Sequence, residues 1–161
     1  MKLYIKQKVF TWGDKFTVKD EMGQDRYYVE GEVFTFGKKL HVYDAFNREV
    51  AFIQQKVFSF MPRYYVFVGD TQVAEIVRKF TLLFSRYYVA GPDWQVEGSF
   101  ADHDYEIFEK GNVIISIHKQ WLTWGDCYEL DISSATDEVL ALATVLAIDC
   151  ATDSVYASSS N

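Results

Sequence analysis

The chain has 161 residues and a mass of 18.7 kDa, which fits one domain with a sizeable core. Its formal net charge is -7 and its isoelectric point is near 4.9, which argues against general nucleic-acid binding because that function needs a basic surface. Aromatic residues make up 17% of the chain and run through its first 130 residues, which favours strands over helices there.

Composition also predicts the organisation and location of the protein. Linker-like stretches are absent, so we expect a single domain over residues 1–161. The start of the chain, Met1 to Lys6, lacks the apolar run of a secretory signal, and two cysteines outside a secretory context are typical of free thiols. We therefore expect a cytoplasmic protein whose contact with a membrane, where it has one, is peripheral.

Twelve β-rich runs follow one another from residue 2 to residue 132. Strand starts lie about 11 to 12 residues apart, which is typical of all-β sandwiches and barrels. Turn residues such as Met22-Gly23 and Gly91-Pro92 separate the runs, and the short connections imply antiparallel pairing. The predicted strands cover residues 2–10, 15–20, 26–34, 38–44, 49–58, 63–69, 72–80, 86–90, 94–100, 104–109, 112–120 and 127–132.

These strands carry an internal repeat of about 24 residues. The segment 9–20 is similar in sequence to the segment 33–44, and 56–66 matches 79–89 almost position by position. The last unit, which begins at Trp121, restores the Thr-Trp-Gly-Asp turn of the first. The strand region therefore holds about six copies of one supersecondary element.

Residues 137–150 form the next predicted element, a helix without a polar face. From Val139 to Ile148 the only polar residue is Thr144, whose hydroxyl we expect to bond to the Leu140 carbonyl. A membrane span needs about 20 apolar residues and this run is shorter, so we expect no transmembrane anchor. The helix should instead be buried in the domain, and residues 151–161 should form a tail.

Helix and strands together predict the fold class. Eight strands make a barrel filled by side chains and sixteen leave a channel, so twelve leave room for one helix of about 10 Å diameter. We expect a mainly β (α+β) protein, a closed antiparallel barrel of about twelve strands around a central C-terminal helix. The alternative is a two-sheet sandwich with an external helix, but an external helix should have a polar face.

The chain resembles a known family in several features taken together. They are the start Tyr4-Ile5-Lys6-Gln7-Lys8, the turn Asp20-Glu21-Met22-Gly23, the Tyr-Tyr-Val repeats and the terminal apolar helix. They are similar to the LURP-one-related proteins of the tubby C-terminal-like superfamily, which also includes phospholipid scramblases. The resemblance implies a twelve-stranded barrel around a central helix over nearly the whole chain, and it leaves the activity open.

The superfamily's known sites do not transfer residue by residue. Tubby-like domains bind phosphoinositide head groups through Lys and Arg on the barrel wall, but this sequence contains no Lys-x-Arg motif of that kind. Scramblases end in a membrane-anchoring helix, whereas the helix here is short and is followed by Asp149.

Strand alternation places most basic residues at one end of the predicted barrel. Odd-numbered strands end and even-numbered strands begin there, so the repeated cations should form a basic rim that attracts an anionic partner. The competing interpretation is that they are solvated edge charges propagated by the repeat. The candidate ligand-binding residues are Lys56, Arg63, Lys79 and Arg86. The other predicted rim charges are Lys8, Lys15, Lys38, Lys39 and Lys119, against Asp14, Asp102, Asp104 and Asp126.

Catalytic and metal chemistry find little support. Asp102-His103-Asp104 looks like a metal cluster, but neighbouring strand residues point to opposite faces and no second His-rich or Cys-rich cluster completes it, so we interpret it as a polar turn. Cys127 has no evident His partner. We expect no cofactor, no metal and no enzymatic activity.

Aromatic residues precede the turns at the same rim. Trp12, Trp124 and Phe36 occupy equivalent places and could plug the barrel mouth or enter a membrane interface. The expected function is a non-enzymatic binding module for an anionic lipid or phosphorylated ligand at the basic rim. The alternative is a structural or protein–protein interaction module without a small ligand.

Overall fold

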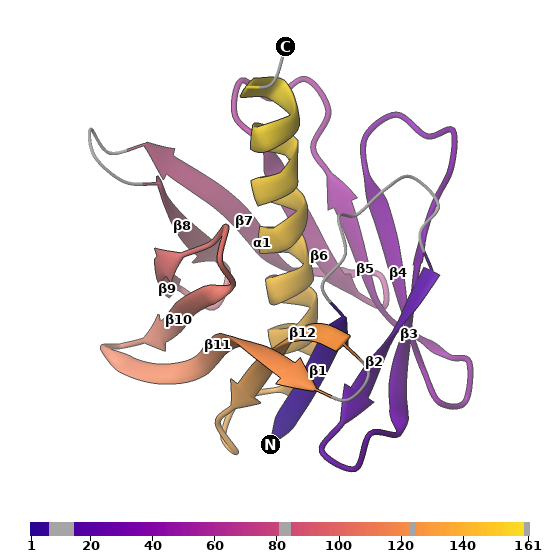
Figure 1. Cartoon of the computed structure of the whole chain (residues 1–161). Coiled ribbons are helices and arrows are strands. Elements are labelled where there is room, and N and C mark those ends of the chain that lie inside the picture. Colours follow the sequence, from indigo (N-terminus) through magenta and orange to yellow (C-terminus); the bar gives the residue numbers. More distant parts are fainter. Residues whose placement is uncertain (7–14, 81–84, 123–124, 160–161) are drawn as a thin grey trace.

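The computed structural model describes residues 1–6, 15–80, 85–122 and 125–159. Its strands form one closed barrel in which each strand pairs antiparallel with its sequence neighbours and β1 pairs with β12 (Figure 1). The predicted fold class is therefore confirmed. The strands are β1 (Lys2–Lys6), β2 (Lys15–Asp20), β3 (Asp25–Gly31), β4 (Lys39–Asp44), β5 (Glu49–Gln55), β6 (Arg63–Val68), β7 (Thr71–Phe80), β8 (Ser85–Ala90), β9 (Trp94–Ser99), β10 (Asp104–Glu109), β11 (Asn112–Leu122) and β12 (Gly125–Ile132).

Side chains of the barrel wall alternate between the lumen and solvent, as the two-residue period of a strand requires. On β1, Leu3 and Ile5 are fully buried, while their neighbours face outward. The largest fully buried side chains include Tyr64 and Tyr105, which point inward from β6 and β10. The core is thus a lining of inward residues around a central axis.

Helix α1 (Glu138–Ser159) forms that axis and runs through the middle of the barrel. Its side chains from Ala141 to Ile148 are completely buried, which explains why the sequence has no polar face there. The Asp137 carboxylate accepts a hydrogen bond from the Leu140 amide at 2.8 Å and caps the helix N-terminus. The Arg26 guanidinium on β3 binds Glu138 (3.1 and 3.2 Å) and holds this end to the wall.

The helix is longer than predicted, and the expected tail over residues 151–161 is wrong for residues 151–159. The polar residues after Cys150 find partners in the barrel wall. The Ser154 hydroxyl donates to the Cys150 carbonyl at 2.8 Å and lies 2.8 Å from the Tyr64 hydroxyl. Thr144 also differs from the prediction, because its buried hydroxyl has no hydrogen-bond partner in the part of the chain that the structure describes.

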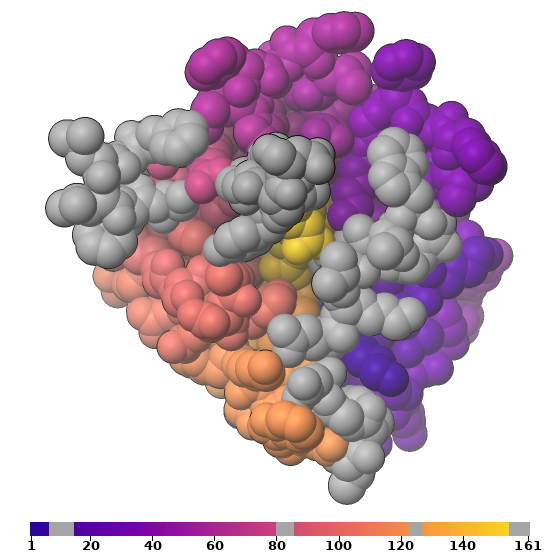
Figure 2. Space-filling view, turned by 45° about the horizontal axis from the view of Figure 1, so that its top comes forward, coloured from indigo at the N-terminus to yellow at the C-terminus, as the bar shows by residue number. Residues whose placement is uncertain are grey.

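Strands β3 and β5 end earlier than predicted, at Gly31 and Gln55. The backbone then leaves the extended conformation, because Phe34 and Phe58 adopt positive φ angles of 58° and 61°. Both residues belong to loops at the end of the barrel where odd-numbered strands stop, which we call the upper rim. The C-terminal end of α1 lies at this rim, where its atoms are visible between the surrounding strands (Figure 2).

Candidate functional site

The four predicted ligand-binding residues lie together on the outer wall at the upper rim. Lys79 on β7 is paired directly with Arg86 on β8. At the corresponding place one unit earlier, the Lys56 amide donates to the Arg63 carbonyl at 2.8 Å. Arg63 in turn is paired with Val77, two residues from Lys79, so the two Lys–Arg pairs are diagonal neighbours. We call Lys56, Arg63, Lys79 and Arg86 the basic stripe.

The two halves of the basic stripe have the same surroundings. The Lys56 ammonium lies 5.7 Å from the ring centre of Tyr65, and the Lys79 ammonium lies 4.5 Å from that of Tyr88. Both distances are those of cation–π contacts, which orient a lysine without neutralising it. The two repeat units therefore share the lysine–tyrosine contact as well as the residue pattern.

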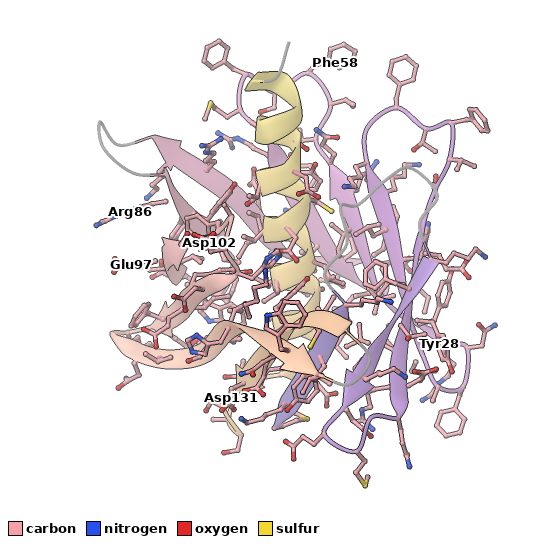
Figure 3. All side chains as sticks on the ribbon, viewed as in Figure 1. Tyr28, Phe58, Arg86, Glu97, Asp102 and Asp131 are labelled. Atoms are coloured by element: carbon pink, nitrogen blue, oxygen red, sulfur yellow. The ribbon has the colours of Figure 1, made fainter. Side chains whose placement is uncertain are left out.

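The arginines differ from the lysines because each has a carboxylate partner. Arg63 Nη1 lies 3.0 Å from Glu75 Oε1, and Arg86 Nη1 lies 3.9 Å from Glu97 Oε1 (Figure 3 labels Arg86 and Glu97). Lys56 and Lys79 have no carboxylate within 4.0 Å among the described residues. Because exposed ion pairs contribute only about 0–1 kcal/mol, the two arginines can exchange a glutamate for another anion at small cost.

Three other lysines of the predicted basic rim are paired with carboxylates. Lys15 pairs with Glu30 at 2.9 Å, Lys39 with Glu32 at 3.2 Å, and Lys38 with Asp153 at 3.9 Å. The prediction counted charges near the turns and missed these partners, because pairing across strands and to the helix depends on register. Lys8 and Asp14 lie outside the described residues.

Two loops at the upper rim present phenylalanines to solvent. The exposed fractions are 100% for Phe34, 86% for Phe36, 98% for Phe58 and 101% for Phe60. Phe34 and Phe58 also adopt left-handed backbone, which costs a non-glycine residue about 1–2 kcal/mol. We call residues 32–38 and 56–62 the aromatic loops. Figure 3 shows Phe58 pointing away from the barrel beside the end of α1.

The aromatic loops are tied to each other and to the wall. A Cβ atom added to Gly37 would lie 3.1 Å from Val57 Cγ1, so the two loops are in contact. The Lys38 amide donates to Gln55 Oε1 at 2.9 Å, and the Thr35 hydroxyl donates to the Gly37 carbonyl at 2.9 Å. The two loops that carry the four exposed rings are thus neighbours at the upper rim.

Sequence reasoning found only part of this aromatic surface. Phe36 points to solvent and does not plug the barrel mouth, while Trp12 and Trp124 lie outside the described residues. Phe34, Phe58 and Phe60 were missed, although Val33-Phe34-Thr35-Phe36 and Val57-Phe58-Ser59-Phe60 repeat one pattern. Trp121 is a further exposed aromatic residue near the end of β11 at the same rim.

A buried polar cluster between α1 and the wall was also missed. Asp149 on α1 accepts a hydrogen bond from the Tyr128 hydroxyl on β12, and His103 stacks on the Tyr128 ring with centres 4.2 Å apart. His103 Nε2 lies 3.6 Å from Asp149 Oδ1. The turn 102–104 is polar as predicted, but it also brings His103 against the helix, where a positive φ of 50° is needed.

Burial decides the protonation of this cluster. Desolvation raises the pKa of the Asp149 carboxyl to about 8, and it lowers the pKa of His103 below its usual value. Both shifts favour the uncharged forms and disfavour an ion pair across the 3.6 Å contact. Among the described residues no group of three His, Cys, Asp or Glu side chains is placed to bind a metal ion.

A surface groove of about 440 Å³ lies at the opposite end of the barrel. Met1, Leu3 and Met22 form its apolar part. The carboxylates Asp20, Glu21 and Glu138 balance Lys2, Arg26 and the Met1 amino group in its lining, so the groove has no excess positive charge for an anion.

The fold defines the class of protein: a closed twelve-stranded antiparallel barrel built around one central helix. The LURP-one-related family matches residues 1–149, and the chain belongs to this family. It is 31% identical over 149 residues to the uncharacterized protein YxjI of Bacillus subtilis (strain 168), with 92% of each chain covered. The resemblance predicted from the sequence is therefore confirmed.

A solved structure supports the fold independently. The X-ray structure of a protein from Arabidopsis thaliana is similar with a TM-score of 0.67 and 17% sequence identity, over 96% of this chain and 90% of that one. At this identity the likeness concerns the fold. None of the helices in the described ranges has the length and apolar character needed to cross a membrane.

Proposed function

We propose that this protein is a non-enzymatic binding module that recognises phosphate-bearing anions, and membrane phospholipids in particular, through the basic stripe. The observation that carries the proposal is the duplicated Lys–Arg pair. In each pair the lysine lies over a tyrosine ring, and each arginine has a glutamate partner, Glu75 for Arg63 and Glu97 for Arg86. A cytoplasmic location with peripheral attachment to a membrane belongs to the same proposal.

The chemistry of the stripe fits a surface that carries many phosphates. A Lys presents a point charge and an Arg presents a planar fork, and both bind phosphate oxygens. Four such groups on one diagonal would contact several head groups at once, and each contributes about 1 kcal/mol near an anionic membrane. The overall charge of -7 does not prevent this, because steering depends on the local potential.

Vesicle co-sedimentation tests the proposal. Phosphatidylcholine vesicles with and without phosphatidylglycerol are used at low and high salt, with the wild-type protein and the variant K56Q/R63Q/K79Q/R86Q. Binding should require the anionic lipid, weaken with salt, and fall by at least about tenfold in the variant. The matched control K19Q/R26Q/R48Q/K110Q removes two lysines and two arginines near the opposite end and should bind like the wild type.

The alternative function, a structural or protein-interaction module, predicts a different outcome. Wild-type protein would then not bind anionic vesicles or soluble polyphosphates at either salt level. Equal loss of binding in the stripe variant and its control would also overturn the proposal, because it would indicate a general charge effect.

A further inference from the structure

We propose that the aromatic loops insert into the interface of a phospholipid bilayer, so that the upper rim of the barrel faces the membrane. This inference deepens the proposed function by naming the loops that enter the bilayer and the end of the barrel that faces it. It rests on the proposed function in one respect, the contact of the basic stripe with lipid phosphates.

The first support is the exposure of four phenylalanines in two neighbouring loops. Isolated exposed apolar residues are common on proteins, but several exposed aromatic residues on two neighbouring loops indicate an interaction surface. Phe34, Phe36, Phe58 and Phe60 are each at least 86% exposed, so they contribute almost nothing to the core. Their repetition at equivalent positions therefore needs an explanation outside the fold.

The second support is the geometry that holds the rings outward. Phe34 and Phe58 carry their rings on left-handed backbone, which a phenylalanine rarely adopts. The contact between Gly37 and Val57 and the bond from the Lys38 amide to Gln55 keep the two loops together. The two loops are thus held together at one rim before any partner binds, which lowers the entropy cost of insertion.

The third support is the distribution of charge around the rings. Lys56, which belongs to the basic stripe, directly precedes Val57 and Phe58 in one aromatic loop. Lys38 and Lys39, at the end of the other loop, are paired with Asp153 and Glu32. Aromatic rings settle at the head-group level of a bilayer, and lysines next to them meet the phosphates. This combination favours an anionic membrane over an apolar protein groove as the occupant.

The lower rim, where even-numbered strands end, provides an internal comparison. Its two most exposed apolar residues, Met22 and Phe46, lie in separate turns, 20–24 and 44–48. The Arg48 guanidinium lies 5.2 Å from the centre of the Phe46 ring. Phe46 therefore offers a control position with a similar side chain but without the neighbouring rings.

Fluorescent labelling tests the insertion directly. Cys127 and Cys150 are both buried, so a cysteine introduced by Phe58→Cys or Phe34→Cys can be labelled selectively with an environment-sensitive dye. On phosphatidylcholine–phosphatidylglycerol vesicles, dyes at these positions should shift to the blue and be quenched by lipids brominated near the head group. A dye introduced by Phe46→Cys should remain in water.

A binding measurement complements the labelling. The variant F34S/F36S/F58S/F60S should bind these vesicles at least tenfold more weakly at high salt, where the charges of the stripe are screened. Its melting temperature should match that of the wild type, because the rings lie outside the core. The control M22S/F46S should bind the vesicles normally.

The outcomes separate this inference from the proposed function. Salt-sensitive vesicle binding with a dye at position 58 that stays in water would overturn the insertion and leave the stripe in place. Insertion that survives the stripe variant would overturn the proposed function alone. A wild-type dimer that F34S/F36S/F58S/F60S converts to a monomer, without vesicle insertion, would show that the rings contact a second copy and would overturn the inference.

Discussion

The Tyr128 hydroxyl on β12 donates a hydrogen bond to the Asp149 carboxyl on α1, which joins the barrel wall to its axis in the buried interior. His103 covers this contact by stacking on the Tyr128 ring. A carboxyl in this position is expensive to ionise, because desolvation outweighs the bond from Tyr128 and raises its pKa to about 8.

This shift predicts a pH dependence of stability. The unfolded carboxyl loses its proton near its usual pKa of 3.8, whereas the folded one keeps it to about 8. The folded state therefore binds more protons across this window, and the free energy of unfolding should fall as pH rises through it. The slope should be at most about 1.4 kcal/mol per pH unit and should flatten above pH 8.

Urea unfolding of Asp149→Asn checks this prediction. The substitution keeps an acceptor for Tyr128 but cannot ionise, so the variant should lose this slope and exceed the wild-type stability at pH 8 by about 1 kcal/mol or more. The comparison is made above pH 6.5, because His103, whose pKa is lowered, contributes a slope of opposite sign below it. Asp70→Asn, in the exposed β6–β7 turn, is the control, and an identical slope in wild type and Asp149→Asn would contradict the prediction.

The position of the axis predicts a severe effect of a charge in its middle. Val145 is completely buried among the inward side chains of the barrel. Val145→Asp would place an unpaired carboxylate there, which should cost several kcal/mol and unfold the domain. Circular dichroism and thermal melting measure the effect, and Val113→Asp, at a half-exposed site on β11, should fold normally. A normal melt of Val145→Asp would show that the helix is peripheral.

Close approach of two strands predicts that Gly98 on β9 cannot be replaced. An added Cβ would lie 2.5 Å from Tyr105 Cα on β10, and the backbone has a φ of +136°. Gly98→Ala should therefore lower stability by about 2 kcal/mol or more in chemical denaturation. Gly111→Ala shares a positive φ but has open space around it, so it measures backbone strain without the clash. Equal losses in the two variants would show that strain alone is responsible.

Much of the architecture could be predicted from local patterns. The two-residue alternation of strands such as β1 and β6, the spacing of their turns and the repeat between 56–66 and 79–89 are properties of neighbouring residues. The apolar run from Val139 to Ile148 had to be buried on all sides, and a barrel of twelve strands has a lumen wide enough for one helix. The helix end was misplaced because the partners of Thr152 and Ser154 come from strands distant in sequence.

The sequence by itself determined that this protein is a barrel with a buried helix, and that Lys56, Arg63, Lys79 and Arg86 recur at equivalent positions, because both conclusions follow from periodicity. Tertiary structure alone decided which cations keep their charge uncompensated, because Glu75 and Glu97 meet the arginines through strand register. It also decided that Phe34 and Phe58 point to solvent and that Asp149 is enclosed, because exposure depends on packing between segments far apart in the chain.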